Sequence, residues 1–171
     1  MGKGRFIAAA LAATAAVATP LAAQGVNPFA MRLLEAHNEA RADVGVPELR
    51  WSYRLAQDAQ DWAEHLARRE QLVHGSIDER KGQGENLWMG QAGYFSAEDM
   101  IGGFVGERRH FRNGEFPAVS RTGQWRDVGH YTQIVWRGTQ EVGCAVARGR
   151  TNDVLVCRYW PAGNTYGQRV Y

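Results

Sequence analysis

The sequence predicts a layered α+β domain, because helical patterns fill the first half of the chain and β-rich runs dominate its last third. The chain has 171 residues, and removing the first 23 leaves 171 − 23 = 148. A chain of that length fits one domain with a core of its own. Two cysteines lie in neighbouring β-rich runs, which adds a candidate covalent link late in the chain.

The N-terminus has the features of a signal peptide. Lys3 and Arg5 form a basic start, and an uncharged, alanine-rich apolar run follows from Phe6 to Ala18. Small residues come next, as at a cleavage point, so we expect residues 1–23 to be removed and residues 24–171 to form the mature domain. An uncleaved anchor is the alternative, although the run is short for a bilayer. We therefore expect a secreted or periplasmic protein with no stable membrane span after cleavage.

The charge balance points away from two classes of partner. The full chain holds 20 basic and 18 acidic residues, and the signal segment removes two basic residues and no acid, so the mature chain is 18 against 18. No basic tail or run of Lys and Arg is present. This composition argues against binding to nucleic acid or to an anionic membrane surface.

Two helices are predicted before residue 75. The first begins at Asn27-Pro28, a cap residue followed by proline at the first helical position, and ends near Gly45. The second begins near Ser52 and ends before Val73. Its apolar residues recur at helical spacing and define one buried stripe: Leu55, Ala59, Trp62 and Leu66.

The middle of the chain alternates loops with short elements. Residues 75–84 are predicted to be loop, and residues 85–88 a short extended piece. Ser96 is predicted to cap a third helix over about 97–111. Residues 113–125 lack periodicity and hold glycines and a proline, so they are predicted to form a long surface loop.

The two cysteines are predicted to face each other across a hairpin. Cys144 and Cys157 lie in β-rich runs on either side of a polar turn, residues 148–153. Export favours a disulfide between them, worth about 3 kcal/mol in the chain-entropy model. The alternative, two metal-binding thiols, lacks a C-x-x-C pair.

Two segments carry a family resemblance. Residues 129–136 read Gly-His-Tyr-Thr-Gln-Ile-Val-Trp, a histidine among polar residues followed by a run predicted to be a strand. Residues 157–167 read Cys-Arg-Tyr-Trp-Pro-Ala-Gly-Asn-Thr-Tyr-Gly and end a strand in a turn. With His37-Asn38-Glu39-Ala40-Arg41 and Gly84-Glu85-Asn86-Leu87-Trp88, they resemble the CAP superfamily over about residues 30–167. This is the SCP domain of cysteine-rich secretory proteins, antigen 5 and pathogenesis-related group 1 proteins.

The resemblance implies a single-domain, bacterial-type member with a three-layer α-β-α sandwich and a small, mainly antiparallel sheet. It also implies a central cleft formed by two histidines and two acids: His74, Glu85, Glu107 and His130. The match at Glu107 departs from the family pattern. Phe104 and Phe111 stand where the family usually has tryptophan and tyrosine, so the polar groups of those side chains are lost.

Histidines and carboxylates of this kind have two interpretations. Two neutral imidazoles, here His74 and His130, can bind Zn²⁺ or another divalent cation, with carboxylates as ligands or as acceptors behind them. The same residues can form a polar network that only orders the cleft. The residues alone favour the network, since no H-E-x-x-H helix is present.

Of the other histidines, His37 is predicted to lie in the core or at the cleft edge, and His65 and His110 to be exposed.

The resemblance implies a non-enzymatic ligand-binding or scaffold module. A groove between the first and third helices, lined by Leu34, Ile101 and Val105, is expected to accept a sterol or a fatty acid. The alternative is a metal-dependent hydrolase, a peptidase or cell-wall amidase, with Glu85 or Glu107 as the base. The sequence leaves the question of catalysis open.

Overall fold

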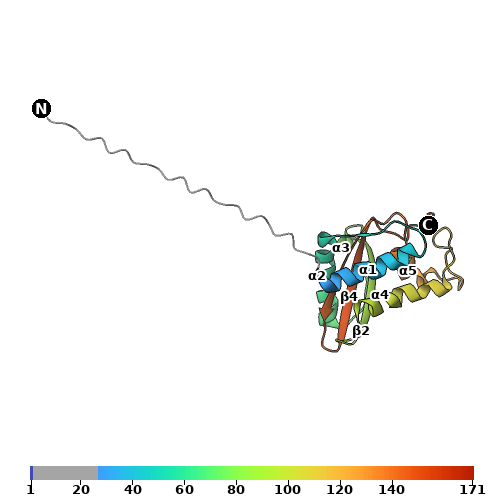
Figure 1. Cartoon of the computed structure of the whole chain (residues 1–171). Coiled ribbons are helices and arrows are strands. Elements are labelled where there is room, and N and C mark those ends of the chain that lie inside the picture. The colour runs from blue at the N-terminus through green and yellow to red at the C-terminus, as the bar shows by residue number, and fades with distance from the viewer. Residues whose placement is uncertain (2–26) are drawn as a thin grey trace.

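A four-stranded sheet forms the centre of the computed structural model, which describes Met1 and residues 27–171 (Figure 1). The predicted cleavage point lies outside the described residues. The strand order is β1-β3-β4-β2. Strand β1 (Arg50–Trp51) runs parallel to β3 (Glu141–Arg148), and β3 is antiparallel to β4 (Asn152–Trp160). Strand β2 (Gly84–Gln91) pairs antiparallel with β4, so the sheet is mainly antiparallel as expected.

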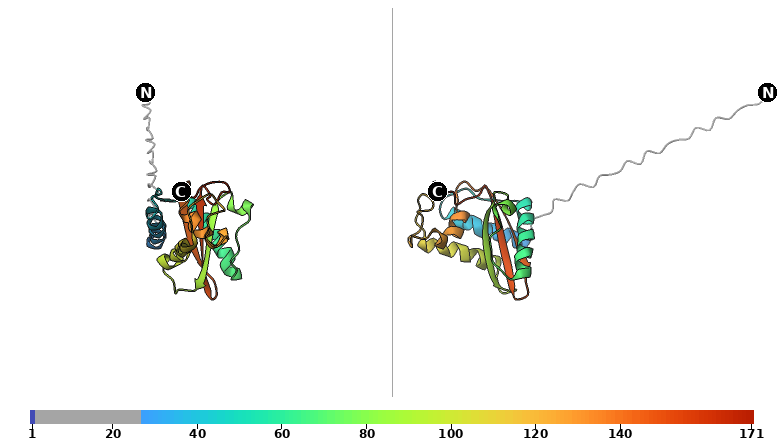
Figure 2. Two further views of the ribbon diagram at one scale, coloured as in Figure 1. Left: turned by 90° about the vertical axis from the view of Figure 1, so that its right-hand side faces the viewer. Right: turned by 180° about the vertical axis from the view of Figure 1, so that it is seen from behind.

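Helices cover both faces of the sheet. Helix α2 (Tyr53–Arg69) packs against β3 and β4 on one face. Helices α1 (Pro28–Ala42), α4 (Ala97–Val105) and α5 (Gly129–Ile134) lie on the other face (Figure 2, left). The predicted three-layer α-β-α sandwich is confirmed.

The predicted helix starts are found at their capping residues. The Asn27 side chain accepts a hydrogen bond from the Ala30 amide at 2.8 Å, and Ser96 forms a capping box with Asp99. The third predicted helix is shorter than expected, because α4 ends at Val105 and continues as the 3₁₀ helix η1 (Gly106–His110). Glycines at 102, 103 and 106 lower the helix propensity of this segment.

The expected loop over residues 75–84 contains one turn of helix, α3 (Ile77–Arg80), which the sequence prediction missed. A capping box between Ser76 and Glu79 explains it, since both side chains bond the opposite backbone amide. The long segment 113–125 is irregular as predicted, and it ends in the 3₁₀ helix η2 (Trp125–Asp127). It is not only surface, because Phe116 and Val119 are buried in it.

The predicted strand within residues 129–136 is wrong, since this segment forms helix α5. Distant residues hold both ends of the helix. Glu107 accepts hydrogen bonds from backbone amides at its start, and Arg41 donates to the carbonyls of Ile134 and Trp136 at its end. Apolar residues in a short run do not distinguish helix from strand, so these partners decide the outcome.

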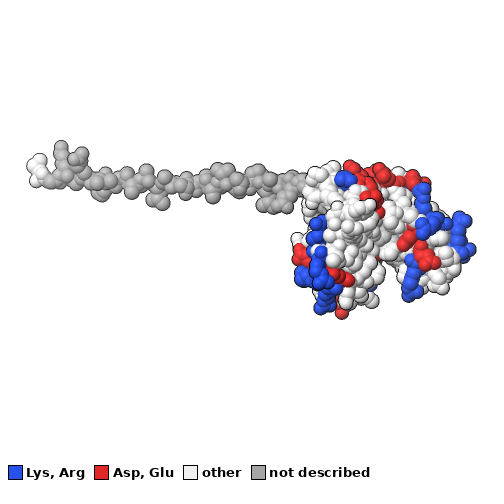
Figure 3. Space-filling model, turned by 90° about the horizontal axis from the view of Figure 1, so that it is seen from below, with Lys and Arg blue, Asp and Glu red and all other residues white. Residues whose placement is uncertain are grey.

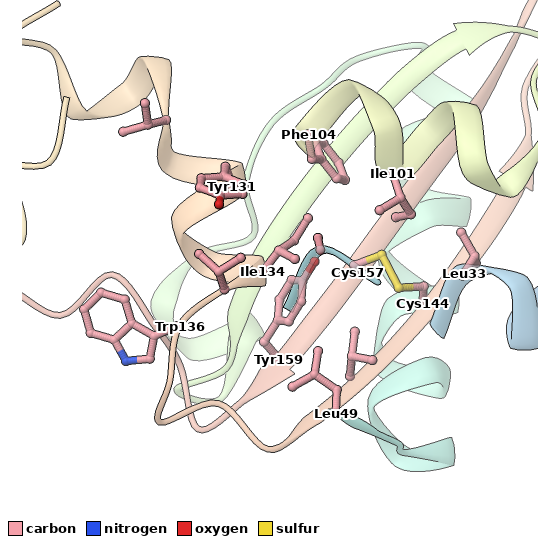
Figure 4. Packing of buried hydrophobic residues seen from close by; sticks show 14 of the residues in the cluster. Leu33, Leu49, Ile101, Phe104, Tyr131, Ile134, Trp136, Cys144, Cys157 and Tyr159 are labelled. Atoms are coloured by element: carbon pink, nitrogen blue, oxygen red, sulfur yellow. A yellow bond between two sulfur atoms is a disulfide. The ribbon is translucent and has the colours of Figure 1, made fainter. Parts of the chain in front are cut away.

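Cys144 and Cys157 form the predicted disulfide across the β3–β4 hairpin. The two residues are register partners, with Cα atoms 4.1 Å apart. Both are buried in the core on the α1 and α4 side, next to Leu33 and Ile101 (Figure 4). In the described part of the chain, no helix has both the length and the apolar character needed to cross a bilayer.

Candidate functional site

A cavity of about 500 Å³ opens between the start of β2, helix α5 and the segment after β4. His74, Glu85 and His130 line it together with aromatic side chains, among them Trp125 and Tyr166. Three of the four residues in the predicted cleft therefore border one space. Glu107 does not line it and lies behind His130.

His74 is held by a buried carboxylate. Its Nδ1 donates to Glu85 Oε1 at 2.7 Å, and the same oxygen accepts from the Gly75 amide at 3.0 Å. The Glu85 side chain is fully buried, whereas the His74 side chain is 59% exposed. A buried carboxylate thus fixes the ring of a histidine that faces solvent.

Arg158 completes this arrangement and was missed by the sequence analysis. Its Nη2 lies 2.9 Å from Glu85 Oε2, and the residue is 1% exposed. Burial lowers the pKa of the Arg158 guanidinium, an effect that the nearby Glu85 opposes. An arginine within the apolar run of β4 was the available signal, because a buried cation needs a partner.

His130 is held in the same way by Glu107. Its Nδ1 donates to Glu107 Oε1 at 2.6 Å, and Glu107 Oε2 accepts from the amides of His130 and Tyr131 at 3.0 and 3.1 Å. The imidazole stacks on Phe104, with ring centroids 4.7 Å apart. Phe104 therefore supplies a packing surface for the imidazole although it lacks a polar group.

His74 and His130 are oriented in the same way. Each directs Nδ1 to a carboxylate, so in the neutral form of the ring Nδ1 carries the proton and Nε2 keeps its lone pair. Among the described residues, neither Nε2 has a hydrogen-bond partner. Each side chain thus retains one unshared ligand nitrogen.

A buried polar chain connects α1 to the site. His37 Nε2 lies 2.8 Å from the Tyr159 hydroxyl, and Asn86 Nδ2 donates to that hydroxyl and to the His130 carbonyl. Burial lowers the pKa of His37 to about 4, so the ring is neutral and its Nδ1 donates to the Leu33 carbonyl. Burial also raises the pKa of Tyr159. His37 is thus a core residue, as predicted.

A second group of potential metal ligands lies in the core. The ligand atoms of His37, Cys144 and Cys157 lie within 4.8 Å of one another, and no other set of three such ligands does so in the described part of the chain. The two sulfurs are bonded to each other, so neither is a thiolate. This group does not fit a metal while the disulfide is intact.

The remaining predicted histidines are less exposed than expected. His65 is half-buried and stacks on Trp62, with ring centroids 4.7 Å apart. His110 is half-buried and accepts a hydrogen bond from Arg109 Nε at 3.0 Å. Neither lines the cavity.

Comparisons with known proteins agree with this fold. The model of the Cysteine-rich secretory protein family, CAP, matches residues 34–159. The chain is 38% identical over 140 residues to pathogenesis-related protein 1C of Nicotiana tabacum, which covers 81% of this chain and 78% of that protein. It is 35% identical over 141 residues to pathogenesis-related protein PRMS of Zea mays, over 81% of this chain and 80% of that protein.

Solved structures share the architecture. The crystal structure of NaASP2 with Zn²⁺ superposes with a TM-score of 0.74 and 26% identity, covering 87% of this chain and 88% of that chain. BmVAL-1 has a TM-score of 0.67 at 21% identity over 84% of this chain and 81% of that chain, a likeness of fold alone. The chain belongs to the cysteine-rich secretory protein, or CAP, family.

Proposed function

We propose that this protein is an exported, non-enzymatic binding module whose cavity takes a divalent cation between His74 and His130. One observation carries the proposal. Both imidazoles donate Nδ1–H to a carboxylate, the arrangement that orients a metal-binding histidine and raises the basicity of its other nitrogen. Nε2 of each ring would hold the ion, which would supply open positions for a further ligand.

The same contacts favour binding over hydrolysis. Glu85 accepts from His74 and Gly75 and lies against Arg158, and Glu107 accepts from His130 and its neighbour. The alternative hydrolase would need Glu85 or Glu107 as a general base that removes a proton from water. In this arrangement neither carboxylate is free to do so. NaASP2, at 26% identity, was crystallised with Zn²⁺, which supports zinc as the class of ion to test first.

Zinc binding is expected to depend on both cavity histidines. Replacing His74 and His130 together with alanine removes both ligand nitrogens, so the affinity for Zn²⁺ in a calorimetric titration should drop by at least about 100-fold. The affinity of the unchanged protein should fall as the pH is lowered, because a protonated imidazole cannot bind a metal. His65→Ala is the matched control and should leave the affinity unchanged. Unchanged affinity in the double variant would remove the metal proposal.

Export and a small apolar ligand are the remaining parts of the proposal. Removal of residues 1–23 leaves a chain that begins at Gln24. We propose a site for a fatty acid or sterol beside Leu34, Ile101 and Val105 from the family resemblance. Ile101 is fully buried in the core there, and Leu34 and Val105 are partly buried against it. Native mass spectrometry of exported protein should give the mass of residues 24–171 with an adduct that organic solvent removes. Only full-length chain would contradict export, and repeated absence of an adduct would contradict the lipid site.

A further inference from the structure

An arginine-rich surface lies around η1 and the segment that follows it. Residues 108–126 hold five arginines and one glutamate, whereas the mature chain as a whole is balanced at 18 against 18. All five arginines are exposed, but Arg108 is paired with Asp43 and Arg126 lies over the Trp125 ring. The other three, Arg109, Arg112 and Arg121, are here called the arginine face. On the side seen in Figure 3, one of two groups of Lys and Arg atoms lies at the right-hand end, with some Asp and Glu atoms among them. Figure 1 shows the end of α4 and the loops after it at that end.

Backbone pairing brings the arginine face together. Phe111 and Ser120 form an antiparallel bridge and are both buried. Successive side chains of an extended segment point to opposite sides, so their neighbours Arg112 and Arg121 project outward together. The Arg121 amide donates to the His110 carbonyl at 2.7 Å, which places this arginine beside the end of η1.

Each guanidinium of the arginine face is oriented through Nε. Arg112 Nε donates to the Ala118 carbonyl at 3.3 Å, and Arg121 Nε donates to the Phe111 carbonyl at 3.1 Å. Arg109 Nε donates to His110 Nε2 at 3.0 Å. These bonds restrict the orientation of the side chains. They use only Nε, so they do not occupy the terminal Nη groups, which form the fork that recognises oxyanions.

In the part of the chain that the structure describes, the arginine face has no carboxylate partner. Among the described residues, none of its three members takes part in an ion pair. Their neighbour Arg108 is paired with Asp43 at 2.8 Å, and exposed arginines on α2 and the β3–β4 hairpin also have carboxylate partners. Within the described residues, no ion pair therefore offsets the positive charge of these three arginines.

We propose that the arginine face binds an anionic polysaccharide through its sulfate, phosphate or carboxylate groups. Two observations favour this partner over other polyanions. No described residue from 106 to 126 is an exposed large apolar side chain of the kind that enters a membrane interface. Trp125 is half-buried with the Arg126 guanidinium over its ring, so it offers no open aromatic platform for the bases of a nucleic acid.

Heparin is a suitable sulfated probe for the full mature protein. We expect binding that weakens by at least about tenfold as salt is raised from about 50 to about 300 mM. Combining Arg109→Gln, Arg112→Gln and Arg121→Gln should weaken binding by at least about tenfold at the lower salt. The matched control combines Arg54→Gln, Arg68→Gln and Arg150→Gln, which removes the same charge from exposed arginines that have carboxylate partners. It should change heparin affinity by less than about twofold.

The fold is checked by thermal unfolding of each variant. If the triple variant does not fold, the three single substitutions are measured instead, and each should weaken heparin binding by about twofold to threefold. Absence of heparin binding, or an equal loss in the control variant, would overturn the proposal. Tighter binding to phosphatidylserine vesicles or to single-stranded DNA than to heparin, with the same dependence on the three arginines, would overturn the choice of polysaccharide.

Discussion

Replacing Arg41 with methionine is expected to lower the free energy of unfolding by about 4 kcal/mol. The side chain is fully buried and has no carboxylate partner among the described residues. Its guanidinium donates instead to the carbonyls of Pro47, Ile134, Trp136 and Thr139, at 2.6 to 3.0 Å. Methionine fills similar volume and leaves these buried acceptors without their donors, each at a cost of about 1–3 kcal/mol.

Urea denaturation of the two proteins measures this effect. Arg137→Met is the matched control, because that arginine is exposed and near in sequence to the carbonyls that Arg41 holds. It should change stability by no more than about 0.5 kcal/mol. A loss below about 1 kcal/mol in Arg41→Met would show that water replaces the guanidinium at these carbonyls.

Acid is expected to destabilise the protein through His37, by about 3 kcal/mol between pH 6.5 and pH 4. Burial, helped by the nearby Arg41 cation, lowers the pKa of His37 from 6.5 to about 4, although the bond to the Leu33 carbonyl opposes the shift. In this interval the unfolded chain binds a proton at His37 and the folded chain does not. The contribution is therefore complete above pH 6.5, is lost as the pH falls, and levels off below about pH 4.

The measurement is the free energy of unfolding at several pH values for the unchanged protein and for His37→Gln. Carboxylates titrate in both, so the difference in slope isolates His37. The variant should be less stable at pH 7 but should lose the part of the pH dependence that belongs to this residue. His65→Gln, which changes a half-buried histidine stacked on Trp62, should keep the full slope. If the free energy of unfolding depends on pH with the same slope in the unchanged protein and in His37→Gln, this prediction is wrong.

The candidate site divides into residues that the sequence predicted and residues that it missed. The resemblance supplied His74, Glu85, Glu107 and His130, and the structure pairs each histidine with one of the acids. Arg158 was not predicted, because its role depends on a carboxylate that lies on a neighbouring strand. The arginine face was also missed, since its members are separated in sequence and no run of basic residues marks it.

Features that depend on near neighbours in the chain were predictable from the sequence. Caps at Asn27 and Ser96 set helix starts, and the β-rich runs around one turn placed Cys144 opposite Cys157. The helix over residues 129–134 was not predictable in this way, because the groups that hold its two ends come from α1 and η1. Local periodicity reports which face of an element is apolar, but a buried polar group takes its partner from wherever the fold brings one. That is why the pattern of elements predicted a layered α+β domain, and the family resemblance its three-layer form, whereas neither predicted that Arg158 would pair with Glu85.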